Sequence, residues 1–387
     1  MSLTVMTIIG TRPEAIKLVP LVLEFQNRSS QFRSVVCVTG QHREMLDQVL
    51  DAFQIQADHD LNLMAPNQTL GLVAARATSG LDNVFSEVKP DVAIVQGDTT
   101  TAFCGALVGH YHQVKVAHVE AGLRTGNKFS PFPEEMNRRL VGRLADLHFP
   151  PTQFACQSLL DEGVCREDIF VTGNTVIDTL FLTRQRVTQS VPEAAKPLVG
   201  VGDGKKLILV TAHRRESHGK GFVNICSAIR DLADQHKDIV FVYPVHLNPN
   251  VQEPVNRIIG DHPRIKLIDP LSYEPFVWLL NECDIVLTDS GGVQEEAPSF
   301  GKPVLVMRDT TERPEGVEAG NAKLVGTDPE KIKAELTTLL TDADAFAAMA
   351  DAKNPYGDGT ASKQIADAIL QKYQLNATTC DSTMCGV

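Results

Sequence analysis

The sequence lacks the short motifs that bind the commonest cofactors. It contains no Gly-x-Gly-x-x-Gly fingerprint, no Gly-x-x-x-x-Gly-Lys-Ser/Thr phosphate loop, no His-Glu-x-x-His pair and no cluster of Cys and His ligands. Dinucleotides, P-loop nucleotides and zinc are usually held by these patterns. The absences argue against bound NAD, P-loop hydrolysis and structural zinc, so we expect neither a cofactor nor a metal.

Basic residues and long apolar runs are also scarce. Lys and Arg number 36 against 48 Asp and Glu, a net charge of −12, which leaves no diffuse basic surface for nucleic acid or an anionic membrane. No apolar stretch approaches the ~18 residues of a membrane span. Gly10, Arg12 and Glu14 come before a signal peptide's apolar core could form. We therefore expect neither nucleic acid nor a membrane as a partner.

The eight cysteines include no Cys-x-x-Cys pair and are mostly isolated in apolar surroundings. This usage predicts buried, reduced thiols and a cytoplasmic location. Cys380 and Cys385 fall near the end of the sequence, where we expect a flexible tail and accidental oxidation rather than a function.

Short β-branched runs alternate with amphipathic stretches along the chain. Near-continuous apolar runs separated by helical spacers indicate parallel strands buried on both faces, which predicts an α/β protein. The expected strands are residues 3–9, 35–39, 92–95, 114–119, 207–210, 240–243, 265–268, 285–288 and 304–306.

The length and two polar breaks predict two doubly wound, Rossmann-like domains. At about 150 residues per domain, 387 residues suffice for two, and a Pro- and Gly-rich segment at 178–206 is typical of a join. A second break lies at 354–359. The predicted parts are a first domain at 1–177 joined by a C-terminal helix at 360–375, a second domain at 178–359, and a flexible tail at 376–387.

Polar residues follow four of the predicted strands, where open parallel sheets bind their ligands. After the first strand, Gly10 permits a tight turn and Pro13 suits the first turn of a helix. Free backbone N–H groups beside Arg12 and Lys17 would form an anion site. An ordinary capped helix with surface charges explains this segment equally well.

A second polar end, residues 289–297, resembles a diphosphate-binding turn. Gly291 and Gly292 let a backbone approach a diphosphate closely, and Ser290 can donate a hydrogen bond. An ordinary helix start is the alternative. Nucleotide binding is favoured because two carboxylates suited to ribose hydroxyls and two cations accompany the turn: Glu295, Glu296, Arg308 and Arg313.

The remaining two strand ends carry acid–base candidates. If Asp98, Glu120 and Glu134 converge, their repulsion should raise the pKa of at least one of them and place an acid beside a base. Alternatively, Asp98 caps a helix and Glu134 pairs with Arg138 one turn along. His213, next to two arginines, could protonate a departing phosphate oxygen or serve only as a structural donor.

Taken together, nine segments resemble the bacterial non-hydrolysing UDP-N-acetylglucosamine 2-epimerases. They occur in order from the first strand to beyond the diphosphate turn. The segments are GTRPEAIK (10–17), VTGQHREML (38–46), GDTTT (97–101), HVEAGLRT (118–125), PEEMNR (133–138), TGNTVID (172–178), AHRRE (212–216), PVHLNP (244–249) and TDSGGVQEE (288–296).

The resemblance implies two GT-B-like domains with an interdomain active-site cleft, the second domain binding UDP. It also implies a homodimer that interconverts UDP-GlcNAc and UDP-ManNAc for envelope polysaccharide. By the same resemblance, catalytic positions fall on Asp98, Glu120, Glu134 and His213, and nucleotide-sugar contacts on Arg12, Lys17, Phe276, Ser290, Gly291, Gly292, Glu296 and Arg313. A substrate-activation site falls on Gln41, His42, Gln68, Arg214 and His246, although Asn67 stands where some relatives have arginine.

The chemistry of the sugar restricts the route. The C2 hydrogen of GlcNAc is not next to a carbonyl, and oxidation of the ring would need a nicotinamide for which no fingerprint exists. Elimination of UDP to 2-acetamidoglucal, followed by re-addition, therefore remains. Two rivals stay open: a GT-B glycosyltransferase with a similar nucleotide site, and a nucleotide-sugar sensor without turnover.

Overall fold

The computed structural model describes residues 2–40, 43–63 and 68–382, without the side chains of 43–45 and 374–382. The chain divides into two compact units, called unit 1 (Met1–Thr179 with Gly357–Val387) and unit 2 (Leu180–Tyr356). The two crossings between the units, after Thr179 and after Tyr356, lie two and three residues from the sequence-based boundaries. Within the described residues, no helix is long and apolar enough to cross a membrane.

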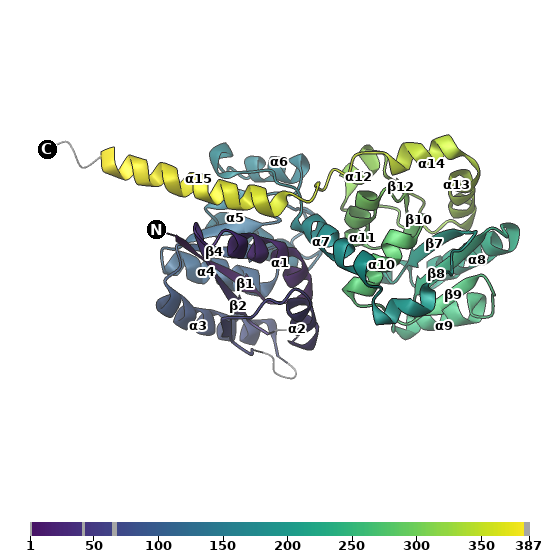
Figure 1. Ribbon diagram of the computed structural model, residues 1–387, viewed down its shortest axis with the longest axis horizontal. Coiled ribbons are helices and arrows are strands. Elements are labelled where there is room, and N and C mark those ends of the chain that lie inside the picture. The colour runs from purple at the N-terminus through teal and green to yellow at the C-terminus, as the bar shows by residue number, and fades with distance from the viewer. Residues whose placement is uncertain (1, 41–42, 64–67, 383–387) are drawn as a thin grey trace. The chain divides into compact units, whose positions relative to one another are not determined.

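Unit 1 is built on a six-stranded parallel sheet (Figure 1). The strand order is β3-β2-β1-β4-β5-β6. The first three strands therefore form one half of the sheet and the last three the other half, with β1 and β4 adjacent at the centre. The strands are β1 Leu3–Ile9, β2 Phe32–Val38, β3 His59–Asp60, β4 Val92–Gln96, β5 Lys115–Val119 and β6 Leu147–Phe149. The central strands are buried on both faces of the sheet, as their apolar runs predict.

Helices cover both faces of this sheet. On one face Met6, Ile8 and Val95 share a buried apolar cluster with Leu81 and Phe85 of α3 and with Ala102, Ala106 and Val108 of α4. The helical elements are α1 Arg12–Asn27, α2 Arg43–Ala52, α3 Leu70–Val88, α4 Thr100–Tyr111, α5 Glu134–Leu144, α6 Gln153–Asp161, η1 Arg166–Asp168, α7 Thr175–Gln189 and α15 Ala361–Ser382.

The last helix, α15, belongs to unit 1 and packs along α1 (yellow in Figure 1). Asp178 begins it by accepting hydrogen bonds from the backbone N–H groups of Ala361 (3.3 Å) and Ser362 (2.8 Å). Lys372 pairs with Asp168 at 2.8 Å farther along. The helix runs to Ser382, into the range predicted as a tail, and residues 383–387 lie outside the described part.

Unit 2 repeats the same topology. Its six parallel strands follow the order β9-β8-β7-β10-β11-β12, and the paired strands β7 and β10 hold the centre. The elements are η2 Glu193–Leu198, β7 Lys206–Thr211, η3 Arg215–Ser217, α8 Lys220–Gln235, β8 Ile239–Pro244, α9 Pro249–Ile259, β9 Ile265–Ile268, α10 Tyr273–Glu282, β10 Ile285–Thr288, α11 Gly291–Glu296, η4 Ala297–Phe300, β11 Val304–Val306, α12 Pro314–Glu318, β12 Ala322–Leu324, α13 Pro329–Thr341 and α14 Ala343–Ala350. The predicted class, two doubly wound Rossmann-like domains, is confirmed.

The predicted join at 178–206 is more helical than its composition suggests. Helix α7 continues through the boundary at Thr179 and Leu180, and η2 follows it. Leu180 and Val187 are buried, which gives α7 an apolar face that the surrounding polar residues hide in the sequence.

The first turns of α1 and α4 pack against each other beside β1 and β4, where the strand order of the unit 1 sheet reverses. A Cβ atom on Gly10 would lie 2.4 Å from Thr101 Oγ1, so glycine is required here for close approach. Glu14, three residues after the N-cap Thr11, is 1% exposed and accepts a hydrogen bond from Thr99 Oγ1 at 2.8 Å. Thr99 in turn caps α4 by accepting from Ala102 N at 3.0 Å.

Burial raises the pKa of Glu14 from 4.5 to about 7, against the opposing effect of hydrogen bonds from Thr99 and Thr11. The folded state therefore binds this proton more tightly than the unfolded chain, so stability from Glu14 is fully present below about 4.5 and is lost as the pH rises through about 7. Glu14→Gln keeps a neutral acceptor. We expect it to match the wild type at pH 4 and to exceed its free energy of unfolding by on the order of 1–3 kcal/mol at pH 8.5.

Urea unfolding at the two pH values measures this difference. The exposed Glu318, changed to Gln, is the matched control and should follow the wild type throughout. Parallel pH curves for wild type and Glu14→Gln would contradict the assignment.

Candidate active site

Glu120 follows β5 and is held from several directions. Its backbone φ is +59°, in the left-handed region, and the residue is 7% exposed. Lys17 Nζ lies 2.7 Å from Oε1 and 2.6 Å from Oε2. Gln96 Nε2 donates to Oε2, and Asn174 Nδ2 donates to Oε1 at 3.0 Å. An ammonium and two amides thus fix this buried carboxylate in one orientation.

Asp98 lies beside Glu120 at the end of the neighbouring strand β4. The intervening Gly97 has φ +66°, and a Cβ atom on it would be 3.4 Å from Glu120 Oε2. The Asp98 carboxylate accepts a hydrogen bond from Arg138, and its backbone oxygen accepts one from Asn137 Nδ2 at 2.9 Å. The cap of α4 is Thr99, so Asp98 does not take the capping role that was its structural alternative.

Glu134 and Glu135 open α5 but have different surroundings. Glu135 is fully buried and accepts from the backbone N–H groups of Thr125 (3.0 Å) and Gly126 (3.2 Å) and from Arg139 Nε (3.1 Å). Glu134 Oε2 is buried and has no hydrogen-bond partner among the described residues. Glu135 is therefore structural, and Glu134 keeps an oxygen available for a ligand.

Arg138, the expected partner of Glu134, instead connects α5 to Asp98 and lies 3.6 Å from Glu135. Asp98, Glu120 and Glu134 thus occupy one edge of unit 1, at the carboxyl ends of β4 and β5 and the start of α5.

The two predicted anion ligands of α1 differ. Lys17 is paired with Glu120. Arg12 is half-buried at the start of the helix, and its guanidinium makes no hydrogen bond or ion pair within the described part of the chain. Of the two, Arg12 is the cation that an anionic ligand could recruit without displacing a carboxylate.

A buried histidine supports the turn before Asp98. Burial lowers the pKa of His118 to about 3, so the ring is neutral at physiological pH, and its Nε2–H donates to the Gly97 carbonyl at 2.8 Å. This arrangement holds Gly97 and, through it, the backbone of Asp98.

In unit 2, Asp289 organises the residues that follow β7. Asp289 is fully buried, and its Oδ2 accepts from the backbone N–H groups of His213 and Arg214 at 2.7 Å each. Its Oδ1 lies 3.5 Å from His213 Nδ1. The imidazole of His213 stacks on that of His246, with centroids 5.5 Å apart. Partial burial lowers the pKa of His213, helped by Arg214 and His246 and opposed by Asp289.

Two guanidinium groups face the glycine turn after β10. A Cβ atom on Gly291 would lie 3.8 Å from Arg313 Cζ and 4.0 Å from an Arg214 nitrogen, whereas one on Gly292 would meet nothing within 4 Å. Ser290 is the N-cap of α11. Cations on one side of an accessible glycine backbone suit a diphosphate.

The other predicted residues of this turn have protein partners. Arg313 Nε pairs with Glu295, and Glu296 accepts from Tyr273 Oη at 3.1 Å. Arg308, predicted with Arg313 as a cation beside bound nucleotide, is instead 6% exposed and pairs with Glu216 (2.6 Å) and Glu312 (3.0 Å). Phe276 is half-buried on α10, against the apolar cluster of unit 2.

The residues of the predicted activation site are only partly described. Gln41, His42 and Asn67 lie outside the described residues. Gln68 is in unit 1, where its Nε2 donates to Leu63 O at 2.8 Å. Arg214 and His246 belong to the His213 group of unit 2.

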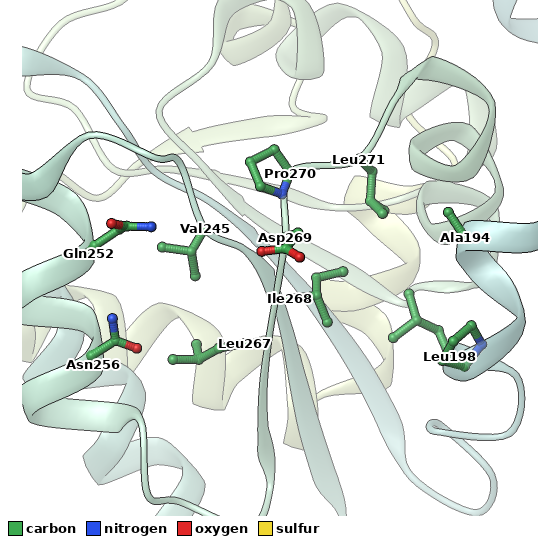
Figure 2. Close-up of a pocket in the computed structure, with 11 residues that line it drawn as sticks. Ala194, Leu198, Val245, Gln252, Asn256, Leu267, Ile268, Asp269, Pro270 and Leu271 are labelled. Carbon is green, nitrogen blue, oxygen red and sulfur yellow. The ribbon is translucent and has the colours of Figure 1, made fainter.

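A separate cavity of about 570 Å³ lies beside the edge strand β9 of unit 2. Figure 2 shows Gln252 and Asn256 of α9 on one side of the strand and Ala194 and Leu198 of η2 on the other. None of its lining residues is a predicted site residue. In the described part of the chain, no group of three or more His, Cys, Asp and Glu side chains is placed to hold a metal ion.

Several residues of these groups were not predicted from sequence as site residues: Gln96, His118, Arg138, Asn174 and Asp289. Four of them occur inside the segments that carry the family resemblance, and Gln96 directly precedes the segment 97–101. Their position in those segments was the available signal, but side-chain direction decides which of them reach the carboxylates and the histidine.

A family model described as UDP-N-acetylglucosamine 2-epimerase matches residues 24–370. The UDP-N-acetylglucosamine 2-epimerase of Escherichia coli (strain K12) is 55% identical over 368 residues, which cover 94% of this chain and 98% of the relative. The protein of the same name from Bacillus subtilis (strain 168) is 54% identical over 372 residues, 96% of each chain.

Solved structures agree with these matches. UDP-GlcNAc 2-epimerase from Neisseria meningitidis, bound to UDP-GlcNAc, has a TM-score of 0.85 at 47% identity and covers 95% of this chain and 100% of its own. The Methanocaldococcus jannaschii enzyme, in complex with UDP-GlcNAc and UDP, has a TM-score of 0.76 at 31% identity, with 95% and 99% covered. The resemblance inferred from the nine segments is confirmed, and the chain belongs to the UDP-N-acetylglucosamine 2-epimerase family.

Proposed function

We propose that this protein interconverts UDP-GlcNAc and UDP-ManNAc by inverting the configuration at C2. The observation that carries the proposal is the group of carboxylates at one edge of unit 1, where Glu120 is fixed by donors and one Glu134 oxygen has no hydrogen-bond partner among the described residues. Family membership supports the substrate class. Proton transfer at carbon needs such acids and bases, whereas binding an anionic nucleotide alone does not.

The route is elimination followed by addition. A carboxylate removes the C2 proton while the C1–O bond breaks, and UDP departs with the electron pair of that bond, leaving 2-acetamidoglucal. A carboxylic acid then protonates C2 from the opposite face, and the UDP oxygen adds back to C1. The same atoms are recovered, so no oxidant or co-reactant is required.

The contacts suggest how the carboxylates divide this work. Asp98 and Glu134 carry the two proton transfers, because Glu134 has a free oxygen and Asp98 lies at the turn beside Glu120. Glu120 is engaged by Lys17, Gln96 and Asn174, which suits an acceptor for sugar hydroxyls that keeps its orientation through the reaction.

Departing UDP needs a cradle of donors and cations. The Ser290–Gly292 backbone with Arg313 and Arg214 provides one in unit 2, and in unit 1 Arg12 is a cation without an ion-pair partner among the described residues. His213 is suited to protonate or stabilise the departing phosphate oxygen.

The proposal includes a cytoplasmic homodimer that supplies ManNAc for envelope polysaccharide. The dimer and the pathway are supported by the family resemblance alone. A reducing compartment is supported further by the six cysteines that the structure describes, all of which are free.

Incubation with UDP-GlcNAc alone in D₂O tests the reaction class. We expect deuterium at C2 of both UDP-sugars, because each reversal takes its proton from a group that equilibrates with solvent. Nuclear magnetic resonance of the recovered sugars measures it. A glycosyltransferase would leave C2 unlabelled without an acceptor, a hydrolysing relative would release free ManNAc, and binding without turnover would favour the sensor.

Conservative variants test the carboxylate roles. Asp98→Asn and Glu134→Gln should each lower kcat by about 10²- to 10⁴-fold, because an amide cannot accept or return the proton. Steady-state epimerisation and C2 exchange, started from each epimer separately, are the measurements. Asp91→Asn is the matched control: Asp91 stands at the opposite end of β4, where it accepts from Thr4 N, and should leave kcat unchanged. Near-normal turnover in either active-site variant would remove that residue from the mechanism.

A further inference from the structure

Asp289 is a buried carboxylate that the proposed reaction does not use directly. It follows β10, whose residues pair in register with β7, so that Thr288 lies opposite Thr211. Its own N–H donates to Thr211 O at 3.0 Å and extends the ladder by one bond. The side chain therefore reaches over the end of β7, where His213 is located.

The two oxygens of Asp289 have different surroundings. Oδ2 accepts two backbone N–H groups, from His213 and Arg214, at 2.7 Å each. Oδ1 is buried without a hydrogen-bond partner among the described residues and lies 3.5 Å from His213 Nδ1. An unpaired buried carboxylate oxygen is costly, so a proton on the facing ring nitrogen is favoured.

We propose that Asp289 is the positioning residue of His213: it fixes the backbone with one oxygen and keeps the proton of the imidazole on Nδ1 with the other, so that Nε2 is the nitrogen presented to departing UDP. The inference rests on the proposed function for the identity of the leaving group. The tautomer and orientation that it assigns to His213 can be tested without turnover.

The charge balance around the ring supports this assignment. Arg214 and His246 are the other charged or titratable groups that face His213 within unit 2, and both disfavour a cationic ring. Asp289 supplies the opposing negative charge. With Nδ1–H directed at Asp289, protonation of Nε2 creates an imidazolium whose charge is partly compensated and whose outer N–H can donate to a phosphate oxygen.

Nitrogen-15 resonances of histidine measure the tautomer directly. In the full-length protein without ligand, we expect neutral His213 to carry its proton on Nδ1, with its signal identified by its loss in His213→Asn. In Asp289→Asn the amide oxygen still accepts the two backbone N–H groups, which turns the NH₂ group toward the ring. The proton should then move to Nε2, and the pKa of His213 should fall further.

Kinetics give a second readout. Asp289→Asn should lower kcat on the order of 10²- to 10⁴-fold, a range that includes the cost of the same change in a Ser-His-Asp triad. The limb of the kcat–pH profile that reports His213 should also move to lower pH. Asp284→Asn is the matched control, because Asp284 precedes the same strand and accepts from Leu207 N at 2.8 Å. It should leave the tautomer of His213, kcat and the pH profile unchanged.

The wild-type spectrum decides the proposal even if Asp289→Asn fails to fold. Neutral His213 with its proton on Nε2 would overturn it, as would an unchanged tautomer and pH profile in a folded Asp289→Asn. Failure of the proposed function is distinguishable: wild-type protein that shows no C2 exchange in D₂O but keeps Nδ1–H on His213 refutes epimerisation while retaining the positional role of Asp289.

Discussion

A carboxylate can be buried only where hydrogen-bond donors contact it, and this constraint determines how the candidate site residues of each unit are arranged. Glu120 satisfies it with an ammonium and two amides from three different segments, Lys17, Gln96 and Asn174. Asp289 satisfies it with two consecutive backbone N–H groups. Each carboxylate therefore holds the ends of adjacent strands together, and these bonds position the side chains that we propose to be catalytic.

Two carboxylates of the candidate site meet this constraint only in part. Among the described residues, one buried oxygen of Glu134 has no hydrogen-bond partner, while its neighbour Glu135 is fully engaged. Asp289 Oδ1 faces the imidazole ring of His213. In the proposed mechanism these two oxygens face a ligand or an imidazole, whereas Glu14 Oε2 and His118 Nδ1, also unpartnered within the described part of the chain, belong to residues that support the fold.

Sequence patterns predicted the central strands well and the edges poorly. Residues 3–9, 285–288 and 304–306 match observed strands inside the sheets, because each is a largely apolar run. The range 265–268 also matches, although β9 is an edge strand. The missed strands β3, β6 and β12 are edge strands of two or three residues and include His59, His148 and Lys323. So short a segment shows no periodicity. In the site, motif position found Glu120 and His213, but the pairing of Lys17 with Glu120 and of Arg308 with Glu216 depends on side-chain direction, which adjacency in sequence does not reveal.

The two-part composition of unit 1 has a consequence for biosynthesis. Helix α15 packs on α1 and is capped by Asp178, yet all of Leu180–Tyr356 is translated between them. At roughly 5–20 residues per second, the ribosome needs on the order of ten to thirty-five seconds for that interval. During this time the surface of α1 that α15 later covers remains exposed on the nascent chain. Helix α15 is synthesised only after unit 2 is complete.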